Sequence, residues 1–331
     1  MYSDKNTVGM KISTAALISH STISIISTNQ TAKIRLAGQS HKFRSKLKKG
    51  ISSRLSSRNP FALDDFRHNR HNSIMGRVFC VANQKGGVGK TTTAVSLADA
   101  FAKSSAKTLL IDFDPQCNAT IALGLDPHKS SPFIPVTETV PFLSDAIIPA
   151  RIPNLDVLPG SRNTADVEVL LRTQPDEAVR IHEQIQQTIL QYEFVLFDCP
   201  PSLGHLTQLA LFSSTEILVP IQCEFFAMEG LVQQMIAVIK KIMEQKPEQL
   251  EFGGILLTMY DASLELTHEV ERQVRDFFGE IVFHSVIPRD VAISEATSHG
   301  VPIIDYAPRS HGARAYMELC MEILEPSRGA R

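Results

Sequence analysis

The sequence lacks any long apolar run. No segment approaches the roughly 18 uninterrupted apolar residues that a membrane-spanning helix needs, so an integral membrane protein is not expected. The segment Ala15–Ile26 is interrupted too often by Ser, Thr and His to form the apolar core of a signal peptide. With 331 residues, of which 43% are hydrophobic, the chain still has ample material for a buried core in one large or two small domains.

Closely spaced cysteines are also missing. The chain has five cysteines, an odd number, and they lie far apart with no Cys-x-x-Cys pair that would suggest a zinc site or a redox motif. A reducing, cytoplasmic environment therefore fits best. The cysteines are Cys80, Cys117, Cys199, Cys223 and Cys320.

The chain has little net charge, −2, but the charges are unevenly distributed. Residues 1–75 contain 13 Lys and Arg against 3 Asp and Glu, whereas residues 76–331 contain 20 against 32. The acidic body gives no broad attraction for nucleic acid. Any DNA contact must come from a local patch or from the basic N-terminal segment.

Residues 1–75 show no sustained helix or strand period. Because 18 of these 75 residues are Ser or Thr and many others are basic, we expect a disordered extension. Three explanations for it stay open: a basic tail that touches an anionic partner, a targeting-like segment, or upstream sequence translated from a mis-assigned start, with Met75 as the true initiator. At the other end, residues 326–331 are expected to form a short tail.

From Arg77 onward, apolar strand patterns alternate with amphipathic helical patterns. This order predicts an α/β fold with a doubly wound, mostly parallel sheet flanked by helices, in a domain spanning 76–325. The proline-rich segment 129–153 is interpreted as an extended surface loop. Helices are predicted at 227–244 and 312–324 from apolar residues at helical spacing. Strands are predicted near 77–82, 107–112, 155–158, 193–198, 215–221, 252–258 and 281–287.

The clearest motif is the glycine-rich segment Gln84–Thr92, which lies between a predicted strand and a predicted helix. A strand, a glycine-rich turn and a helix in that order form a phosphate cradle, because the glycines let successive N–H groups turn toward an anion. Lys90 adds a point charge and Thr91 offers a hydroxyl to Mg²⁺. A turn that merely connects strand to helix would explain the glycines but not the two spaced lysines, Lys85 and Lys90.

The common form of this motif has glycine where the chain has Gln84, and a second lysine follows. The run Lys-Gly-Gly-Val-Gly-Lys-Thr resembles the deviant Walker A motif of the ParA/MinD family of P-loop ATPases. The resemblance implies ATP and Mg²⁺ as cofactors, and an ATP-bound sandwich homodimer in which Lys85 reaches the partner's phosphates. It implies catalytic roles for Lys85 and Lys90, and nucleotide binding by Gly86, Gly87, Val88, Gly89, Lys90, Thr91 and Thr92.

Two carboxylates, Asp112 and Asp114, follow a buried strand at the expected carboxyl edge of the sheet, where open α/β sheets bind ligands. Unpaired acids are costly at such a position without a cation. The segment Leu109–Gln116 resembles a second signature of the family. The resemblance implies that Asp114 positions the attacking water and that Asp112 supports the outer shell of Mg²⁺. The alternative is that both acids only cap a turn.

The segment Phe194–Gly204 is again an apolar strand that ends in an acid, followed by a Pro-Pro turn. It resembles the Walker B motif and the switch that follows it. By that resemblance Asp198 holds Mg²⁺ through water, and the loop 199–204 moves when the γ-phosphate is lost. The metal site is thus expected to comprise Thr91, Asp112 and Asp198.

Later segments, among them Val219–Gly230 and Val286–Asp290, resemble the chromosomal ParA (Soj) branch. The resemblance runs from about Gly76 to Leu324 and leaves residues 1–75 uncovered. It implies that Pro288 lies against adenine, that ATP turnover is slow, and that a ParB-like partner accelerates it. The expected function is a switch in chromosome or plasmid partitioning. The alternative is an orphan ParA-like ATPase that positions a cargo other than the chromosome.

The chain departs from the family at three positions. Ser263 and Ala292 replace two arginines that help relatives bind DNA without sequence preference, and each loss removes one phosphate contact per subunit. DNA binding, and with it association with the nucleoid, is therefore put in doubt. Cys117 stands where the family has glycine, and we expect a modest backbone adjustment there.

Other kinds of switch with this phosphate loop fit less well. A membrane-binding switch needs a basic amphipathic C-terminal helix, which the six residues after Glu325 are too few to form, so no membrane partner is expected. Electron-donating iron–sulfur relatives need cluster cysteines, whereas Cys117 and Cys199 belong to the nucleotide motifs. A protein that only binds the nucleotide also fits less well, because Lys85, Lys90, Thr91, Asp114 and Asp198 are all present.

Overall fold

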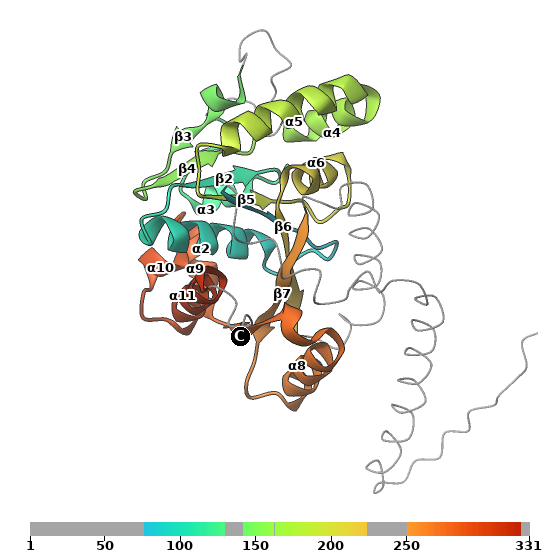
Figure 1. The fold of residues 1–331 in the computed structure, drawn as a ribbon. Helices are drawn as coiled ribbons and strands as arrows, with labels where there is room; N and C mark the ends of the chain where they lie inside the picture. Colours follow the sequence, from blue (N-terminus) through green and yellow to red (C-terminus); the bar gives the residue numbers. More distant parts are fainter. Residues whose placement is uncertain (1–75, 130–141, 162, 224–249, 326–331) are drawn as a thin grey trace, which may run out of the picture. The chain divides into compact units, whose positions relative to one another are not determined.

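The computed structural model describes residues 76–129, 142–161, 163–223 and 250–325. These residues belong to one compact unit, an eight-stranded sheet between two layers of helices (Figure 1). The predictions of a disordered extension at 1–75, of a helix at 227–244 and of a tail at 326–331 lie outside the described residues.

The sheet has the order β3-β4-β2-β5-β1-β6-β7-β8, and among the described residues every neighbouring pair is parallel except β3 with β4. The predicted doubly wound fold is confirmed, and the predicted strand ends agree to within about two residues. The strands are β1 (Arg77–Val81), β2 (Thr108–Asp112), β3 (Ile148–Pro149), β4 (Leu155–Leu158), β5 (Phe194–Asp198), β6 (Glu216–Gln222), β7 (Glu251–Tyr260) and β8 (Val282–Pro288).

The central strands are apolar on both faces, as parallel strands between two helix layers must be. Every residue of β2 and β5 is buried. Their aspartates are the last residues of these strands, and the two strands pair in a register that sets Asp112 beside Asp198. The carboxyl ends of β1, β2 and β5 therefore bring the glycine-rich loop and both acids to one edge of the sheet.

One face of the sheet carries α2 (Lys90–Lys103), α3 (Asn118–Ala122), α9 (Val291–Ser298), α10 (Ile303–Tyr306) and α11 (His311–Leu324). The opposite face carries α4 (Thr164–Thr173), α5 (Pro175–Ile189), α6 (His205–Ser213) and α8 (Glu265–Phe278), together with the short 3-10 turns η1 (Leu143–Ala146) and η3 (Gly279–Ile281). Figure 1 shows α2 and α11 on one side of the strands and α4 to α6 on the other. Within the described ranges, no helix is long and apolar enough to cross a membrane.

The interpretation of 129–153 as an extended surface loop is wrong for its second half. The turn η1 and the strand β3 lie in this segment, and β3 pairs antiparallel with β4 at the sheet edge. The side chains of Leu143 and Ala146 are buried in the core. Two strand residues are too few to give an alternating pattern in the sequence. The five prolines between 129 and 153 therefore favoured the prediction of a loop.

The end of α2 is joined to α10 by an ion-pair network. The Lys103 ammonium lies 2.6 Å from Asp99 Oδ1 and 2.8 Å from Asp305 Oδ1. The Asp99 side chain is fully buried and its second oxygen has no partner among the described residues, whereas 43% of the Asp305 side chain is exposed. Burial raises the pKa of Asp99 to about 6, although Lys103 opposes the shift.

Asp99 predicts a pH dependence of stability. Because its pKa is higher in the folded protein than in the unfolded chain, the folded state holds this proton more tightly, and stability falls as pH rises from about 4 to about 6. Asp99→Asn should remove this fall. The difference in free energy of unfolding between the variant and the wild type should therefore shift in favour of the variant by up to about 3 kcal/mol from pH 4 to pH 7.

Urea unfolding at several pH values measures this difference. Asp305→Asn is the matched control, because it removes the exposed partner of the same lysine. Burial is the largest cause of the Asp99 shift and Asp305 the smallest, so most of the pH dependence should remain. Parallel pH curves for wild type and Asp99→Asn would contradict the assignment.

Candidate functional site

The glycine-rich loop leads directly into α2, whose first residue is Lys90. Gly87 and Gly89 have φ angles of 73° and 88°, in the left-handed region that residues with a Cβ rarely adopt. A Cβ on Gly86 or Gly87 would meet no protein atom within 4 Å. The loop backbone is therefore open to a ligand at the N-terminus of a 14-residue helix, where N–H groups and the helix dipole favour an anion.

Side chains from neighbouring strands hold the loop from behind. The Thr258 hydroxyl at the end of β7 donates a hydrogen bond of 2.9 Å to the Val88 carbonyl. Asn83 donates to the Pro220 carbonyl of β6 at 2.7 Å and accepts from the Lys85 N–H at 3.0 Å. Sequence analysis missed these residues, because the contacts of Asn83 and Thr258 reach strands far along the chain and no local pattern marks them.

The two lysines of the motif lie in different surroundings. Lys90 is buried, and its ammonium donates to the Lys85 carbonyl at 3.3 Å. Burial lowers the pKa of Lys90, and the charges of Asp198 and Asp114 oppose this shift. The half-buried Lys85 points its ammonium to Gln222 Oε1 at the end of β6, 3.2 Å away. Gln222 was not predicted as a site residue.

Asp198 is a buried carboxylate to which no described residue donates a hydrogen bond. Its side chain is fully enclosed, and neither oxygen makes a hydrogen bond within the part of the chain that the structure describes. Burial and then the neighbouring Asp112 raise its pKa well above the ordinary range. The Thr91 hydroxyl opposes this shift but lies outside the geometry of a hydrogen bond. Such a charge is costly unless another group compensates it.

Asp112, by contrast, is held on several sides. One oxygen accepts from the Asp114 N–H at 3.2 Å, and the other accepts from the N–H and hydroxyl of Thr120 at 2.9 and 2.7 Å. Burial raises the pKa of Asp112 to about 6, the Thr120 bonds oppose the shift, and the Asp114 charge adds to it. The Gly160 N–H donates to the same Thr120 hydroxyl at 2.8 Å. A carboxylate with this many fixed donors is a rigid neighbour of Asp198.

Asp114 is 6% exposed and lies in a tight turn after β2. Its Oδ1 accepts from the Gln116 N–H at 2.9 Å, and its carbonyl accepts from the Cys117 N–H at 2.8 Å. Cys117 has a φ of 55° and a ψ of 33°, the left-handed conformation that glycine adopts most easily. The expected backbone adjustment thus takes the form of local strain, of roughly 1–2 kcal/mol for a residue with a side chain.

The site therefore contains three neighbouring carboxylates and a buried ammonium. No group of three or more His, Cys, Asp or Glu side chains is arranged to hold a metal among the described residues. Mg²⁺, however, is usually bound by one or two protein ligands together with phosphate oxygens and water. The unpartnered Asp198 beside Thr91 fits that kind of cation site.

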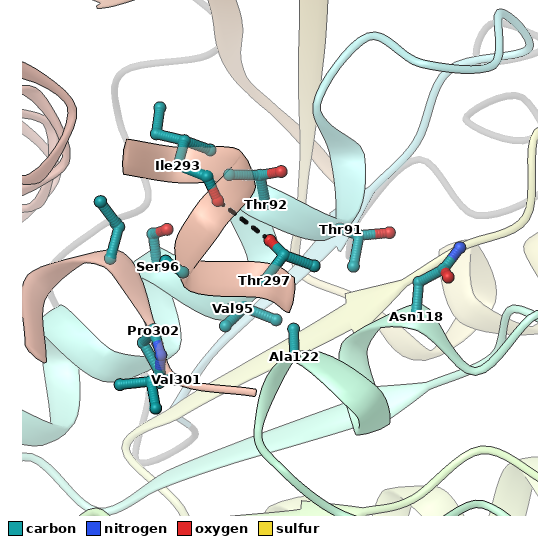
Figure 2. A pocket seen from close by; sticks show the side chains of 12 residues that line it. Thr91, Thr92, Val95, Ser96, Asn118, Ala122, Ile293, Thr297, Val301 and Pro302 are labelled. Atoms are coloured by element: carbon teal, nitrogen blue, oxygen red, sulfur yellow. Dashed lines mark hydrogen bonds between the residues drawn. The ribbon is translucent and has the colours of Figure 1, made fainter. Parts of the chain in front are cut away.

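A hollow of about 190 Å³ lies next to the loop, between α2, α3 and α9 (Figure 2). Figure 2 shows Thr91 and Thr92 at its edge, facing Asn118 on one side and Ile293 and Thr297 on the other. Apart from Thr91, Thr92, Asn118, Thr297 and Ser96, the side chains that line the hollow are apolar. The remaining lining residues are Val95, Ser96, Ala122, Ala296, Val301, Pro302 and Ile303.

Comparison with known proteins agrees with this geometry. A family model described as an AAA domain matches residues 76–252. The sporulation initiation inhibitor protein Soj of Bacillus subtilis is 39% identical over 250 residues, which cover 75% of this chain and 98% of that protein. The chromosome partitioning protein ParA of Caulobacter vibrioides is 38% identical and covers 76% and 95% of the two chains. The chain belongs to the ParA/MinD family, in its Soj/ParA branch.

Solved structures of similar proteins agree with this membership. Cobyrinic acid a,c-diamide synthase from Mycobacterium smegmatis, with bound ADP and magnesium, is 31% identical with a TM-score of 0.63, over 75% of this chain and 93% of that one. The septum site-determining protein MinD from Pyrococcus horikoshii, complexed with Mg-ADP, is 26% identical with a TM-score of 0.61, over 76% and 97%.

Three positions singled out by comparison with this family lie in the later part of the chain, between the end of β7 and the first turn of α9. Pro288 ends β8 and is outside the lining of the hollow, although α9, which begins three residues later, contributes to it. Ser263 is exposed, and its N–H and hydroxyl both donate to Asp261 Oδ1 at 3.0 and 2.6 Å. Ala292 is the second residue of α9 and packs against the core on the face of the sheet that carries α2 and α11.

The burial of Asp198 predicts that this carboxylate lowers the stability of the metal-free protein, a member of the ParA/MinD family. Asp198→Asn removes a buried carboxylate whose raised pKa makes it costly to ionise, and it does so without changing side-chain size. Without metal and nucleotide the variant should therefore be more stable than the wild type at neutral pH, by about 1–3 kcal/mol. Urea unfolding in a chelating buffer at neutral pH measures it.

Asp126→Asn serves as the control, because 44% of that side chain is exposed and the change should be nearly neutral. A less stable Asp198→Asn variant would show that the carboxylate is compensated within the chain.

Proposed function

We propose that the protein is a Mg²⁺-dependent ATPase whose ATP-bound form is a homodimer, and that it acts as a switch in chromosome or plasmid partitioning. The proposal is carried by the buried Asp198 carboxylate, which lies beside the open glycine-rich loop and accepts no hydrogen bond from the residues that the structure describes. Relatives named as partitioning proteins and neighbours solved with ADP and magnesium support it.

The nucleotide phosphates would lie on the N–H groups of the loop, with Lys90 as the buried counter-charge. The loop residues Gly86 to Thr92 form this cradle, and Pro288 would lie on the adenine side. The hollow beside Thr92 lies at the edge of the cradle and is lined by α9, so it would receive part of the nucleoside. An apolar pocket with a few polar groups suits such a ligand.

The cation would be held by the Thr91 hydroxyl and, through water, by Asp198, with Asp112 in the outer shell. When bound, Mg²⁺ would neutralise charge on the phosphates. The donor set suits it, because a hydroxyl and a carboxylate are hard oxygen ligands that leave sites for phosphate oxygens and water. Asp112, already fixed by Thr120, would keep its orientation and act through a water molecule.

Hydrolysis would need an oriented water molecule more than covalent chemistry. We assign this orientation to Asp114, whose turn is fixed by Gln116 and Cys117 and which lies close enough to influence Lys90 electrostatically. Lys90 and Lys85 would stabilise the charge of the transferred phosphoryl group.

The dimer gives Lys85 its role. In the present structure the Lys85 ammonium bonds to Gln222 of its own chain, so it must leave this acceptor to reach a partner's phosphates. The closed dimer would then differ from the free chain in the partner of this one lysine. A ParB-like protein that favours the closed arrangement would raise turnover.

A second function is favoured by the loss of the two DNA-binding arginines. Ser263 faces Asp261 instead of presenting a cation, and Ala292 packs inward. Because neither side chain carries a positive charge and the surrounding domain is acidic, non-specific attraction to DNA is weakened. The alternative is therefore an orphan ParA-like ATPase whose cargo is not the chromosome.

Replacing Asp114 and Lys85 should separate turnover from dimerisation. Asp114→Ala should lower ATP turnover by roughly 100-fold or more and leave ATP-dependent dimerisation intact. Lys85→Ala should abolish both, because it removes the group that reaches the partner. Phosphate release and analytical ultracentrifugation with ATP and Mg²⁺ measure the two properties, with Asp126→Ala as an exposed control. Unchanged turnover in Asp114→Ala would refute its assigned role.

A DNA-binding titration with ATP and Mg²⁺ distinguishes the two functions. If the protein is a partition switch, the full chain binds duplex DNA at about 50 mM salt and loses affinity by 200 mM. Ser263→Arg should tighten binding and steepen the salt dependence by about 0.9 per added phosphate contact. Val179→Arg, an exposed position on α5, is the charge-matched control.

Absence of binding at low salt in the wild type would favour the orphan ATPase. A chain that begins at Met75 tests the basic N-terminal segment in the same titration. If only the full chain binds, residues 1–75 supply the DNA contact.

A further inference from the structure

Glu168 on α4 joins that helix to the start of α6. Its Oε1 accepts a hydrogen bond of 2.7 Å from the His205 N–H, and its Oε2 accepts one of 2.9 Å from the Leu206 N–H. The His205 ring nitrogen Nδ1 lies 3.1 Å from Oε1. Burial alone would raise the pKa of Glu168, but the Leu206 and His205 donors outweigh it and hold this pKa below its ordinary value.

The carboxylate also packs tightly against the end of the loop 199–204. A Cβ on Gly204 would lie 2.5 Å from Glu168 Oε1, so a larger residue there would force the carboxylate to shift. No side chain of the loop itself caps α6, since its N-cap residue is Gly204 and makes no side-chain hydrogen bond. The cap of α6 is thus supplied from another helix, 37 residues earlier in the chain.

The loop held in this way begins directly after Asp198. The Thr207 hydroxyl donates to the Ser202 carbonyl at 2.7 Å, which ties the middle of the loop to the first turn of α6. A displacement of the start of α6 would therefore also displace the loop, including the residues that directly follow Asp198.

The other end of the α4 segment is anchored at the second acid. Gly160 lies four residues before α4, and its N–H donates to the Thr120 hydroxyl, which in turn donates to Asp112. A Cβ on Gly160 would lie 2.9 Å from the Asp112 carboxyl carbon. Gly160 and Glu168 thus contact the two sides of the site: Gly160 lies against the acid that ends β2, and Glu168 binds the start of α6, which follows the loop after β5.

We propose that Glu168 is a positioning residue that holds the loop 199–204 in register with Asp198 and Asp112 and couples movement of this loop to α4. This inference rests on the proposed ATPase function. Two charge-assisted hydrogen bonds from adjacent N–H groups fix both the position and the direction of the helix start. A loop that moves with the γ-phosphate must then either carry α4 with it or break these bonds.

The test uses the full chain with Glu168→Gln and Glu168→Ala. The glutamine can still accept one of the two N–H bonds through its carbonyl oxygen, whereas alanine accepts neither. We expect kcat for ATP to fall roughly 10-fold in Glu168→Gln and up to about 100-fold in Glu168→Ala, because small displacements of a positioned group cost that much. KM for ATP should stay within about 2-fold, since the phosphate cradle is untouched.

Asp166→Asn is the matched control. It removes an equal charge from the exposed first turn of the same helix, and it should leave kcat unchanged. A purely structural role for Glu168 predicts instead a lower melting temperature with kcat of the folded variants unchanged, and that result would overturn the inference.

Hydrogen exchange of the His205 and Leu206 amides gives a second measurement that needs no ATP turnover. Both amides should exchange at least about 10-fold faster in Glu168→Ala than in the wild type, because they lose their acceptor. Equal exchange rates would also overturn the inference. A wild-type chain that does not hydrolyse ATP would contradict the proposed function, and the exchange rates would then still decide whether Glu168 holds the loop.

Discussion

The structure is organised around one electrostatic constraint, the buried and unpaired carboxylate of Asp198. Parallel pairing of β2 and β5 sets Asp112 directly beside it, and burial makes each charge more costly to the other. Lys90 is a buried cation nearby, yet the Asp198 oxygens accept no hydrogen bond among the described residues. The folded chain thus carries a cost that a divalent cation would remove, and this is the physical reason for assigning one to the site.

The remaining structure keeps this edge rigid while leaving it open. Thr258 and Asn83 support the loop backbone from β7 and β6, so the glycines that face the ligand need no support from their own side chains. Thr120 fixes Asp112 from α3, and Glu168 fixes the start of α6 from α4. Lys85, by contrast, donates to Gln222, an acceptor that it would exchange for a partner's phosphates in the proposed dimer. A loop and acids that are held in place by several elements, together with one lysine that can change its partner, suit a nucleotide-dependent switch.

The sequence predicted the parts of this site that are local. Strand ends and motif residues follow from short patterns, because a parallel strand between helices is a continuous apolar run and its last residue is already at the sheet edge. The sheet was therefore predicted correctly, and Asp112 and Asp198 lie at strand ends as expected, with Asp114 in the turn after β2. The strand β3 was missed because two residues carry no period.

Contacts between distant segments could not be predicted from single motifs. Nothing near Glu168 in the sequence indicates that it caps α6, and nothing near Gln222 indicates that it accepts from Lys85. Likewise Asp198 is an ordinary strand-end acid in the sequence, and only the packing around it shows that its oxygens lack hydrogen bonds among the described residues.

The most direct measurement is a calorimetric titration of Mg²⁺ into the wild type and Asp198→Asn, each in the presence of a non-hydrolysable ATP analogue. If the cation compensates Asp198, the wild type binds Mg²⁺ at least about 10-fold more tightly than the variant, as expected for the loss of a group that orients the metal's shell. Equal Mg²⁺ affinities in the two proteins would contradict the account.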